Sequence, residues 1–315
     1  MNSIPSLDLN KFLSKDNNEK NQFVIDLGNA FTEIGFVSLK GHFLNKTLME
    51  QLYEQVKLFF DLPTSVKQSY EIKDLHGQRG YTSFGKEQAV GHNSADLKEF
   101  WHFGQEPDPS YGFTKHYHKN IQVNELKEFN VVGMQAFRAL EKTGVFLLRS
   151  IALYLRLPEN YFDQWVNMGN SILRPIHYPP ITQEPKDAIR AAAHGDINLI
   201  TLLMGASSGG LEVLSKNDEW IPAQPDDDEL VINVGDMLER LTNNKLKSTI
   251  HRVINPPQST WHIPRYSIPF FMHPRLDMPL DCLDSCISNE KPKDYEDILA
   301  GDFLMERLKA IGLIK

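Results

Sequence analysis

Between residues 171 and 272 the sequence repeats one pattern, in which short apolar and β-branched runs alternate with turn-forming residues. This pattern favours a sandwich or barrel of strands over alternating βαβ units. Gly209-Gly210 and Asn243-Asn244 are among the pairs that supply turns between the runs. The expected strands cover residues 171–178, 188–193, 199–204, 211–214, 230–234, 247–253 and 265–272.

The residues before this region have a mixed helical and strand character. Residues 4–9 alternate, residues 36–39 predict a strand, and residues 75–117, rich in Gly, His and aromatic side chains, are expected to be mostly loop. Apolar spacing predicts helices over residues 21–34, 45–60 and 124–155, and a last helix over residues 295–311 that ends at Gly312.

No repeat and no flexible linker divides the chain, which predicts a single domain over residues 1–315. Within it we distinguish a mixed helical N-terminal portion (1–165), a β core that carries the metal site described below (166–280) and a C-terminal helix (281–315).

Charge and composition exclude several classes of function. The 33 Lys and Arg residues against 41 Asp and Glu residues give a net charge of −8 and disfavour a nucleic-acid partner. No apolar run approaches the roughly 20 residues that cross a bilayer, and the first residues lack a secretory pattern, so we expect a cytoplasmic protein without a membrane partner. Cys282 and Cys286 are then expected to be free thiols, and the oligomeric state stays open.

A candidate metal site begins at His194-Gly195-Asp196. In an extended segment residues two apart point to the same side, so His194 and Asp196 can hold one ion together. His251 lies in a later strand-like segment and can complete the set from a neighbouring strand. Two imidazoles and one carboxylate leave other metal positions open, which is the arrangement of non-haem iron(II) oxygenases.

A second motif follows at the start of the last predicted strand. Alternation places Arg265, Ser267, Pro269 and Phe271 on one face of this strand. A guanidinium beside a hydroxyl group forms a fork that suits a carboxylate. The sequence therefore predicts a carboxylate-binding site next to the metal.

Taken in order, these motifs resemble a known family. Arg174-x-x-x-Tyr178-Pro179-Pro180, His194-x-Asp196, His251 and Arg265-x-Ser267 are similar to the iron(II)- and 2-oxoglutarate-dependent dioxygenases of the isopenicillin N synthase-like branch. The likeness covers residues 170–275, and residues 4–9 and 35–39 also resemble the N-terminal part of that branch. Many plant members have Asn-Tyr-Tyr-Pro where this chain has Ile176-His177-Tyr178-Pro179, so part of the polar setting of the co-substrate differs.

The resemblance implies a mainly β fold with flanking helices, whose core is a distorted jelly roll, or double-stranded β-helix. His194, Asp196 and His251 would bind Fe(II), while Arg265 and Ser267 would hold the distal carboxylate of 2-oxoglutarate with a hydroxyl contact from Tyr178. The implied enzyme is an oxidoreductase that uses O2 and couples decarboxylation of 2-oxoglutarate to hydroxylation, desaturation or cyclisation of a small molecule. The candidates for the substrate pocket are Tyr81, Phe84, Phe100, His102 and Phe271.

Two alternatives remain at this level. An oxidase of the isopenicillin N synthase type keeps the iron but binds its own substrate's carboxylate on the Arg265 and Ser267 fork, without 2-oxoglutarate. A jelly-roll binding protein without turnover uses the same fold with no catalytic metal. The sequence does not identify the primary substrate, because pocket residues come from loops.

Overall fold

The computed structural model describes residues 3–75, 77–86, 97–185, 188–205 and 209–310. The strands are β1 (Ser6–Asp8), β2 (Phe36–Lys40), β3 (Gly80–Thr82), β4 (Glu99–Gly104), β5 (Ile172–Leu173), β6 (Ile176–Tyr178), β7 (Ala191–His194), β8 (Ile200–Met204), β9 (Leu211–Leu214), β10 (Trp220–Pro222), β11 (Leu230–Val234), β12 (His251–Val253) and β13 (Arg265–Met272). The α-helices are α1 (Leu9–Leu13), α2 (Asn17–Glu33), α3 (Lys46–Phe60), α4 (Thr64–Ser69), α5 (Lys127–Tyr154), α6 (Asp163–Val166), α7 (Asp236–Leu241) and α8 (Ala300–Ala310), and short 3-10 helices cover Lys73–Leu75, Gly112–His116, Gln258–Thr260 and Asp284–Cys286.

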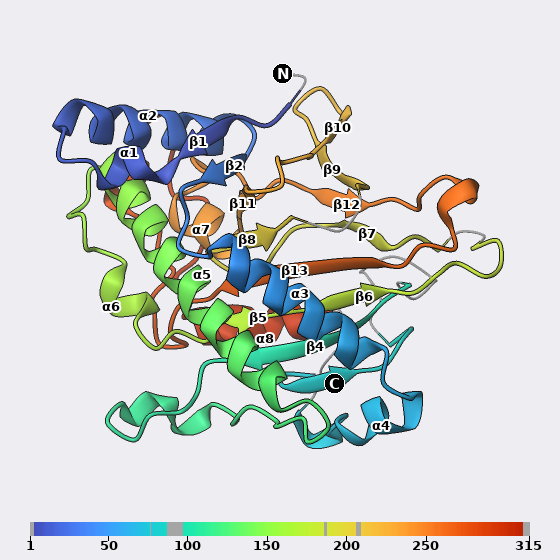
Figure 1. Ribbon diagram of the computed structural model, residues 1–315. Coiled ribbons are helices and arrows are strands. Elements are labelled where there is room, and N and C mark those ends of the chain that lie inside the picture. The colour runs from blue at the N-terminus through green and yellow to red at the C-terminus, as the bar shows by residue number, and fades with distance from the viewer. Residues whose placement is uncertain (1–2, 76, 87–96, 186–187, 206–208, 311–315) are drawn as a thin grey trace.

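The strands form two sheets that face each other, as expected for a double-stranded β-helix (Figure 1). The large sheet has the order β1-β2-β11-β8-β13-β5-β4-β3, with β6 paired to β13 and β4. The small sheet has the order β10-β9-β12-β7. Antiparallel pairing of β8 with both β11 and β13 places these three strands at the centre of the large sheet.

Both faces of the large sheet are covered, so its central strands are apolar on both sides. On β8, Leu202 and Met204 belong to the core shared with the helices, whereas Leu203 packs in the smaller core between the two sheets. On β11 the same alternation places Ile232 towards the helices and Val231 towards the small sheet. The space between the sheets is therefore the interior of the jelly roll.

The helices α2, α3 and α5 form the outer layer over the large sheet (Figure 1). The predicted helices at residues 45–60 and 124–155 are confirmed as α3 and α5. Asn45 caps α3, because its side-chain oxygen accepts the backbone N–H of Leu48 at 2.9 Å. One core cluster runs from Leu9 to Ala300. This continuous core supports a single domain. The single domain and its three portions stay predictions.

The structure corrects several sequence predictions. The described residues of 75–117 are mostly outside helices and strands, as predicted, but β3 and the fully buried β4, which the sequence did not predict, also lie there. The strand at 171–178 is broken into β5 and β6, the strand at 247–253 shortens to β12, and β10 was missed. The last helix begins at Ala300 rather than at residue 295, since a β-bridge between Pro279 and Leu299 keeps the preceding residues extended. Gly312, its predicted end, lies outside the described residues.

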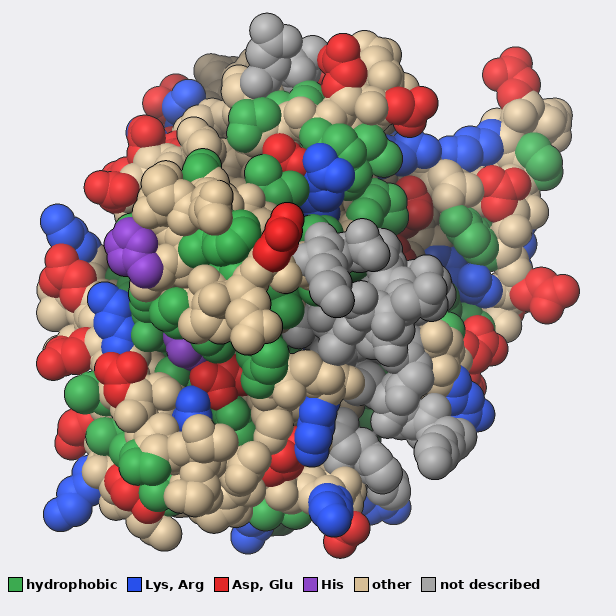
Figure 2. Space-filling model, turned by 90° about the vertical axis from the view of Figure 1, so that its right-hand side faces the viewer, with side chains coloured by type: hydrophobic (Ala, Val, Ile, Leu, Met, Phe, Trp, Pro, Cys, Tyr) green, Lys and Arg blue, Asp and Glu red, His purple; other side chains and the backbone are tan. Residues whose placement is uncertain are grey.

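Two further observations concern the surface and the thiols. Acidic and basic side chains are interspersed over the described part of the face in Figure 2. Among the described residues, no helix is both long enough and apolar enough to span a bilayer. Cys282 and Cys286 are free, as expected, and both are buried.

Candidate metal centre

Three elements of the jelly roll bring the predicted metal ligands together. His194 ends β7 and His251 begins β12, and the two residues are paired in register across these neighbouring strands. Asp196 lies two residues beyond His194, just past the end of β7. The backbone N–H of Asp236, at the start of α7, holds this segment by a 2.7 Å hydrogen bond to the Asp196 carbonyl.

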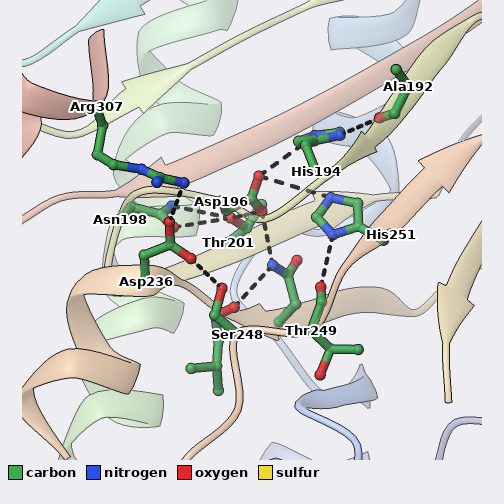
Figure 3. A network of polar contacts seen from close by, with 12 residues as sticks. Ala192, His194, Asp196, Asn198, Thr201, Asp236, Ser248, Thr249, His251 and Arg307 are labelled. Carbon is green, nitrogen blue, oxygen red and sulfur yellow. Dashed lines mark hydrogen bonds and ion pairs between the residues drawn. The ribbon is translucent and has the colours of Figure 1, made fainter. Parts of the chain in front are cut away.

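The ligand atoms of these residues converge. The Nε2 atoms of His194 and His251 lie 4.0 Å and 3.8 Å from Oδ1 of Asp196. One ligand atom from each residue lies within 4.8 Å of the other two, the only such cluster of three among the described residues. Figure 3 shows both imidazoles directed at the Asp196 carboxylate. Atoms this close can contact one ion through ligand bonds of about 2 Å.

Each imidazole is oriented by its other nitrogen. Nδ1 of His194 lies 2.7 Å from the carbonyl oxygen of Ala192, and Nδ1 of His251 lies 3.2 Å from that of Thr249 (Figure 3). A carbonyl accepts, so both Nδ1 atoms carry a proton, and Nε2 of each ring faces the centre. Loss of hydration, and then the neighbouring His251, lower the pKa of His194, which favours this neutral form.

The carboxylate of Asp196 is held from the opposite side. Its Oδ2 accepts hydrogen bonds from Thr201 Oγ1 at 2.6 Å and from Asn233 Nδ2 at 2.8 Å, which leaves Oδ1 for the histidines. Burial alone would raise the pKa of Asp196, but the two imidazoles and these hydrogen bonds outweigh it and lower the pKa. Thr201 and Asn233 were not predicted, although each is a polar residue inside an apolar strand and so gave a signal.

The donor set fits a divalent iron ion. Neutral imidazole and carboxylate ligands suit Fe(II), and two histidines with one carboxylate leave positions on the metal for other ligands. The site reaches solvent on the side of His194, since 41% of this side chain is exposed whereas Asp196 and His251 are buried. Hydrogen bonds behind each ligand are the usual support of a metal site.

Arg265, Ser267 and Tyr178 lie together inside the jelly roll. Arg265 is paired in register with Tyr178 across β13 and β6, and all three side chains are buried. The guanidinium carbon of Arg265 lies 5.0 Å from the centre of the Tyr178 ring. Burial lowers the pKa of Arg265, and the Tyr178 hydroxyl opposes this shift. The cation expected to bind a carboxylate is therefore enclosed by the protein.

Three of the five predicted pocket residues gather around one arginine. The guanidinium carbon of Arg174 lies 4.5 Å from the Phe100 ring centre and 5.1 Å from that of Phe271. Nε of Arg174 donates to Nε2 of His102 at 2.5 Å. Phe271 is opposite Thr201 in the β13–β8 pairing, and the Thr201 hydroxyl donates to Asp196. Phe271 therefore lies on the same side of the large sheet as the metal ligands. The sequence marks Arg174 only as part of the motif that includes Tyr178 and does not predict it as a pocket residue.

The other two predicted pocket residues lie elsewhere. Tyr81 is paired with Trp101, on the face of β4 opposite to Phe100, and it packs 6.1 Å from Phe59 in the helical core. This placement corrects the prediction, which failed because one sequence does not reveal which face of β3 turns inward. Phe84 follows β3 and is half exposed.

His273 is a buried residue near this site that sequence reasoning missed. Burial lowers the pKa of His273 to about 4, while the charge of Asp196 opposes and that of Arg174 reinforces the shift. Both charges act on it because it follows β13 at the metal end of that strand. Its Nδ1 has no hydrogen-bond partner among the described residues.

Two family models match the chain. Residues 4–126 match the N-terminal region of non-haem dioxygenases in morphine synthesis, and residues 169–274 match the 2OG-Fe(II) oxygenase superfamily. A 2-oxoglutarate-Fe(II) type oxidoreductase of Emericella nidulans is 30% identical over 95% of this chain and 89% of its own length. A proline hydroxylase of Petromyces alliaceus is also 30% identical, over 97% of this chain and 98% of its own.

Solved structures agree with these matches. A 2OG-Fe(II) oxygenase family protein of Caulobacter crescentus is 42% identical, with a TM-score of 0.89 over 99% of this chain and 100% of that one. A full-length Neurospora crassa protein, crystallised with alpha-ketoglutarate (2-oxoglutarate) and thymine, is 31% identical, with a TM-score of 0.86 over 98% of this chain and 96% of that one.

Proposed function

The chain belongs to the 2-oxoglutarate-Fe(II) oxygenase superfamily, and on this premise we propose that His194, Asp196 and His251 hold its catalytic iron. As a member it is an oxidoreductase that uses Fe(II), 2-oxoglutarate and O2. The observation that carries the assignment is the convergence of three ligand atoms within 4.8 Å. We assign the distal carboxylate of 2-oxoglutarate to Arg265, Ser267 and Tyr178, which are buried on the paired strands β6 and β13.

The protein's own contribution is orientation and exclusion of water. When bound, the iron supplies the activation of O2 that is coupled to decarboxylation of 2-oxoglutarate into succinate and CO2. His194 and His251 present Nε2 because their Nδ1 atoms are bound to backbone carbonyls. Asp196 presents Oδ1 because Thr201 and Asn233 occupy its other oxygen. Buried Arg265 fixes the far end of the co-substrate by charge and by paired donors.

The primary substrate is, in this proposal, a small molecule with a flat part and hydrogen-bond acceptors. The rings of Phe100 and Phe271 offer stacking surfaces next to the Arg174 guanidinium. His102 holds this guanidinium: its Nε2 accepts from Arg174, and its Nδ1 therefore donates to the Gly77 carbonyl at 2.5 Å. Thymine, the ligand in the Neurospora crassa complex, has such a flat ring with carbonyl acceptors.

The experiment is a stoichiometric assay. The protein is supplied with Fe(II), ascorbate, 2-oxoglutarate and a panel of small acids, amino acids, purines and pyrimidines, and succinate, O2 and product are measured together. We expect one compound to stimulate 2-oxoglutarate consumption, with one succinate formed per O2 consumed. Asp196→Ala is the matched control and should form no product.

Two outcomes would overturn the proposal. Oxidation of a substrate with no succinate formed would favour an oxidase of the isopenicillin N synthase type. Stoichiometric iron retained in both His194→Ala and Asp196→Ala would show that the metal lies elsewhere. For the pocket, Arg174→Gln should raise the KM of the stimulating compound and leave 2-oxoglutarate binding within about twofold.

A further inference from the structure

Arg190 is a second buried arginine inside the jelly roll. It immediately precedes β7, and only 2% of its surface is exposed. Its Nη2 donates to the carbonyl of Ile263 at 3.4 Å, which is at the long limit for a hydrogen bond. Its Nε has no hydrogen-bond partner, and the described residues place no carboxylate in an ion pair with it. Within the described part of the chain, donors of this cation are thus left unused.

Arg190 and Arg265 approach the same ring from different sheets. Their guanidinium carbons lie 5.9 Å and 5.0 Å from the centre of the Tyr178 ring. Arg265 belongs to β13 of the large sheet, whereas Arg190 leads into β7 of the small sheet. The bond from Arg190 to Ile263, two residues before β13, directs the side chain towards the start of that strand. The two cations therefore lie beside the same ring, close enough for the charge of Arg265 to act on Arg190.

Two like charges buried beside one ring repel each other. Burial lowers the pKa of Arg190 to about 10, and the positive charge of Arg265 adds to the shift. A buried charge is normally paired within the protein or by a ligand. Here the partner has to come from outside the described chain, and a carboxylate can accept from both guanidinium groups because its oxygens offer about four lone-pair sites.

We propose that Arg190 is a second cation for the distal carboxylate of 2-oxoglutarate, which it binds together with Arg265. This inference rests on the proposed co-substrate site at Arg265, Ser267 and Tyr178. Arg265 would donate to one side of the carboxylate, and Arg190 would donate to the other. The binding of a dicarboxylate then removes the repulsion between the two guanidinium groups.

The test compares two ligands on several variants by calorimetry, with iron(II)-loaded protein under nitrogen so that no turnover occurs. 2-Oxopentanoate has the keto acid end of 2-oxoglutarate but a methyl group in place of the distal carboxylate. We expect Arg190→Gln to weaken 2-oxoglutarate binding about 10- to 100-fold, as for loss of a charged hydrogen bond. Binding of 2-oxopentanoate should change less than about threefold. Arg190→Lys should weaken 2-oxoglutarate less than Arg190→Gln does.

Control variants distinguish failure of the Arg190 role from failure of the proposed co-substrate site at Arg265. Arg149→Gln removes an arginine that pairs with Asp163 at 2.7 Å, outside the jelly roll, and should not change the preference for 2-oxoglutarate. Arg265→Gln should abolish that preference; if it does not, the co-substrate site itself is wrong. If Arg265→Gln abolishes it and Arg190→Gln leaves 2-oxoglutarate affinity within about twofold, only the role of Arg190 is refuted. Equal weakening of both ligands by Arg190→Gln also refutes it.

Stability gives a second readout. Removal of an uncompensated buried charge should keep or raise the melting temperature of ligand-free Arg190→Gln, while the rise in Tm on adding 2-oxoglutarate shrinks. A marked loss of ligand-free stability, or no folded protein, would mean that Arg190 supports the fold. Arg190→Met, which keeps an apolar stem but carries no charge, would then decide the ligand role: unchanged 2-oxoglutarate affinity in this folded variant would overturn the inference.

Discussion

Asp196 and Glu99 are both buried carboxylates with a histidine beside them, but their surroundings differ. Glu99, on β4, binds Lys67 through both oxygens at 2.9 Å, accepts from the Tyr81 hydroxyl and lies 2.7 Å from Nδ1 of His177. Asp196 receives only neutral donors, both on Oδ2, and Oδ1 faces two imidazole nitrogens. One carboxylate is neutralised by the protein, and the other is left to bind a cation.

The two carboxylates show how a structural cluster differs from a binding site. Burial raises the pKa of Glu99, but His177, Tyr81 and Lys67 outweigh it, so the negative charge is stabilised by groups that belong to the chain. The cluster joins α4 to β4 and needs no ligand. Among the described residues, Asp196 lacks a cationic partner of this kind and Arg190 lacks an anionic one. The Asp196 carboxylate and the Arg190 guanidinium both lie inside the jelly roll, where a metal ion and an anionic co-substrate would pair with them.

The largest expected effect is loss of iron on removal of a ligand. In Asp196→Ala, bound iron and substrate-dependent succinate formation should fall to background, because no other carboxylate faces the two Nε2 atoms among the described residues. The metal-free variant should stay as stable as the metal-free parent. Metal analysis after dialysis and thermal unfolding without metal check these two statements. A large loss of stability without loss of iron would show that Asp196, like Glu99, supports the fold and does not bind the metal.

The second-largest effect is the opposite one, a loss of stability without a loss of iron. Glu99→Ala leaves Lys67 as an unpaired buried charge, so the free energy of unfolding should fall by about 3–5 kcal/mol, while the folded fraction keeps its iron. Urea denaturation of metal-free protein measures the loss. Lys67→Met combined with Glu99→Gln is the matched control, since neutralising both partners should recover most of the stability. Loss of iron in folded Glu99→Ala would contradict a purely structural role.

A smaller effect is expected from the hydrogen bonds behind Asp196. Asn233→Ala and Thr201→Val should each weaken iron(II) binding by about 10- to 100-fold, since they remove the donors that orient the carboxylate. Competition with a chelator measures the affinity. Thr242→Val, which removes a buried hydroxyl bonded to the Leu238 carbonyl, should leave it unchanged. If the Thr242 variant weakens iron binding as strongly as the Thr201 variant, the effect is general rather than local.

The smallest effect is a pH dependence from His273. Burial lowers its pKa to about 4, below the usual value of 6.5, so between these values the unfolded chain binds a proton that the folded protein does not. Stability of the metal-free protein therefore falls as the pH drops from 6.5 towards 4, by at most about 1.4 kcal/mol per pH unit from this group. His273→Asn should show a shallower fall in urea denaturation series. An unchanged slope would mean that His273 is not buried as a neutral group.

The sequence placed two short motifs on one side of the chain, because residues two apart in extended backbone share a face: His194 with Asp196, and Arg265 with Ser267. The structure brings His251, far along the chain, beside the first pair across β7 and β12. The roles of these residues as iron ligands and co-substrate contacts stay predictions. The central strands β9, β11 and β13 were predicted with their observed bounds, since turn residues delimit them.

The rest depends on which faces of distant elements meet. Tyr81 was misassigned because β3 and β4 are buried on both faces, which hides the alternation that marks an inward side. The Glu99 cluster gave no signal, since Lys67 and His177 reach Glu99 from different elements. Arg190 lies just ahead of a predicted metal ligand, yet its lack of an acidic partner among the described residues becomes visible only when both sheets are placed.

A crystal structure of the protein with iron(II) and 2-oxoglutarate, grown without O2 and measured at the iron absorption edge, would show where the metal and the co-substrate bind. We predict one iron peak bound by Nε2 of His194, Oδ1 of Asp196 and Nε2 of His251, with the distal carboxylate of 2-oxoglutarate on Arg265. An iron peak away from these three side chains, or a co-substrate whose distal carboxylate does not contact Arg265, would contradict the account.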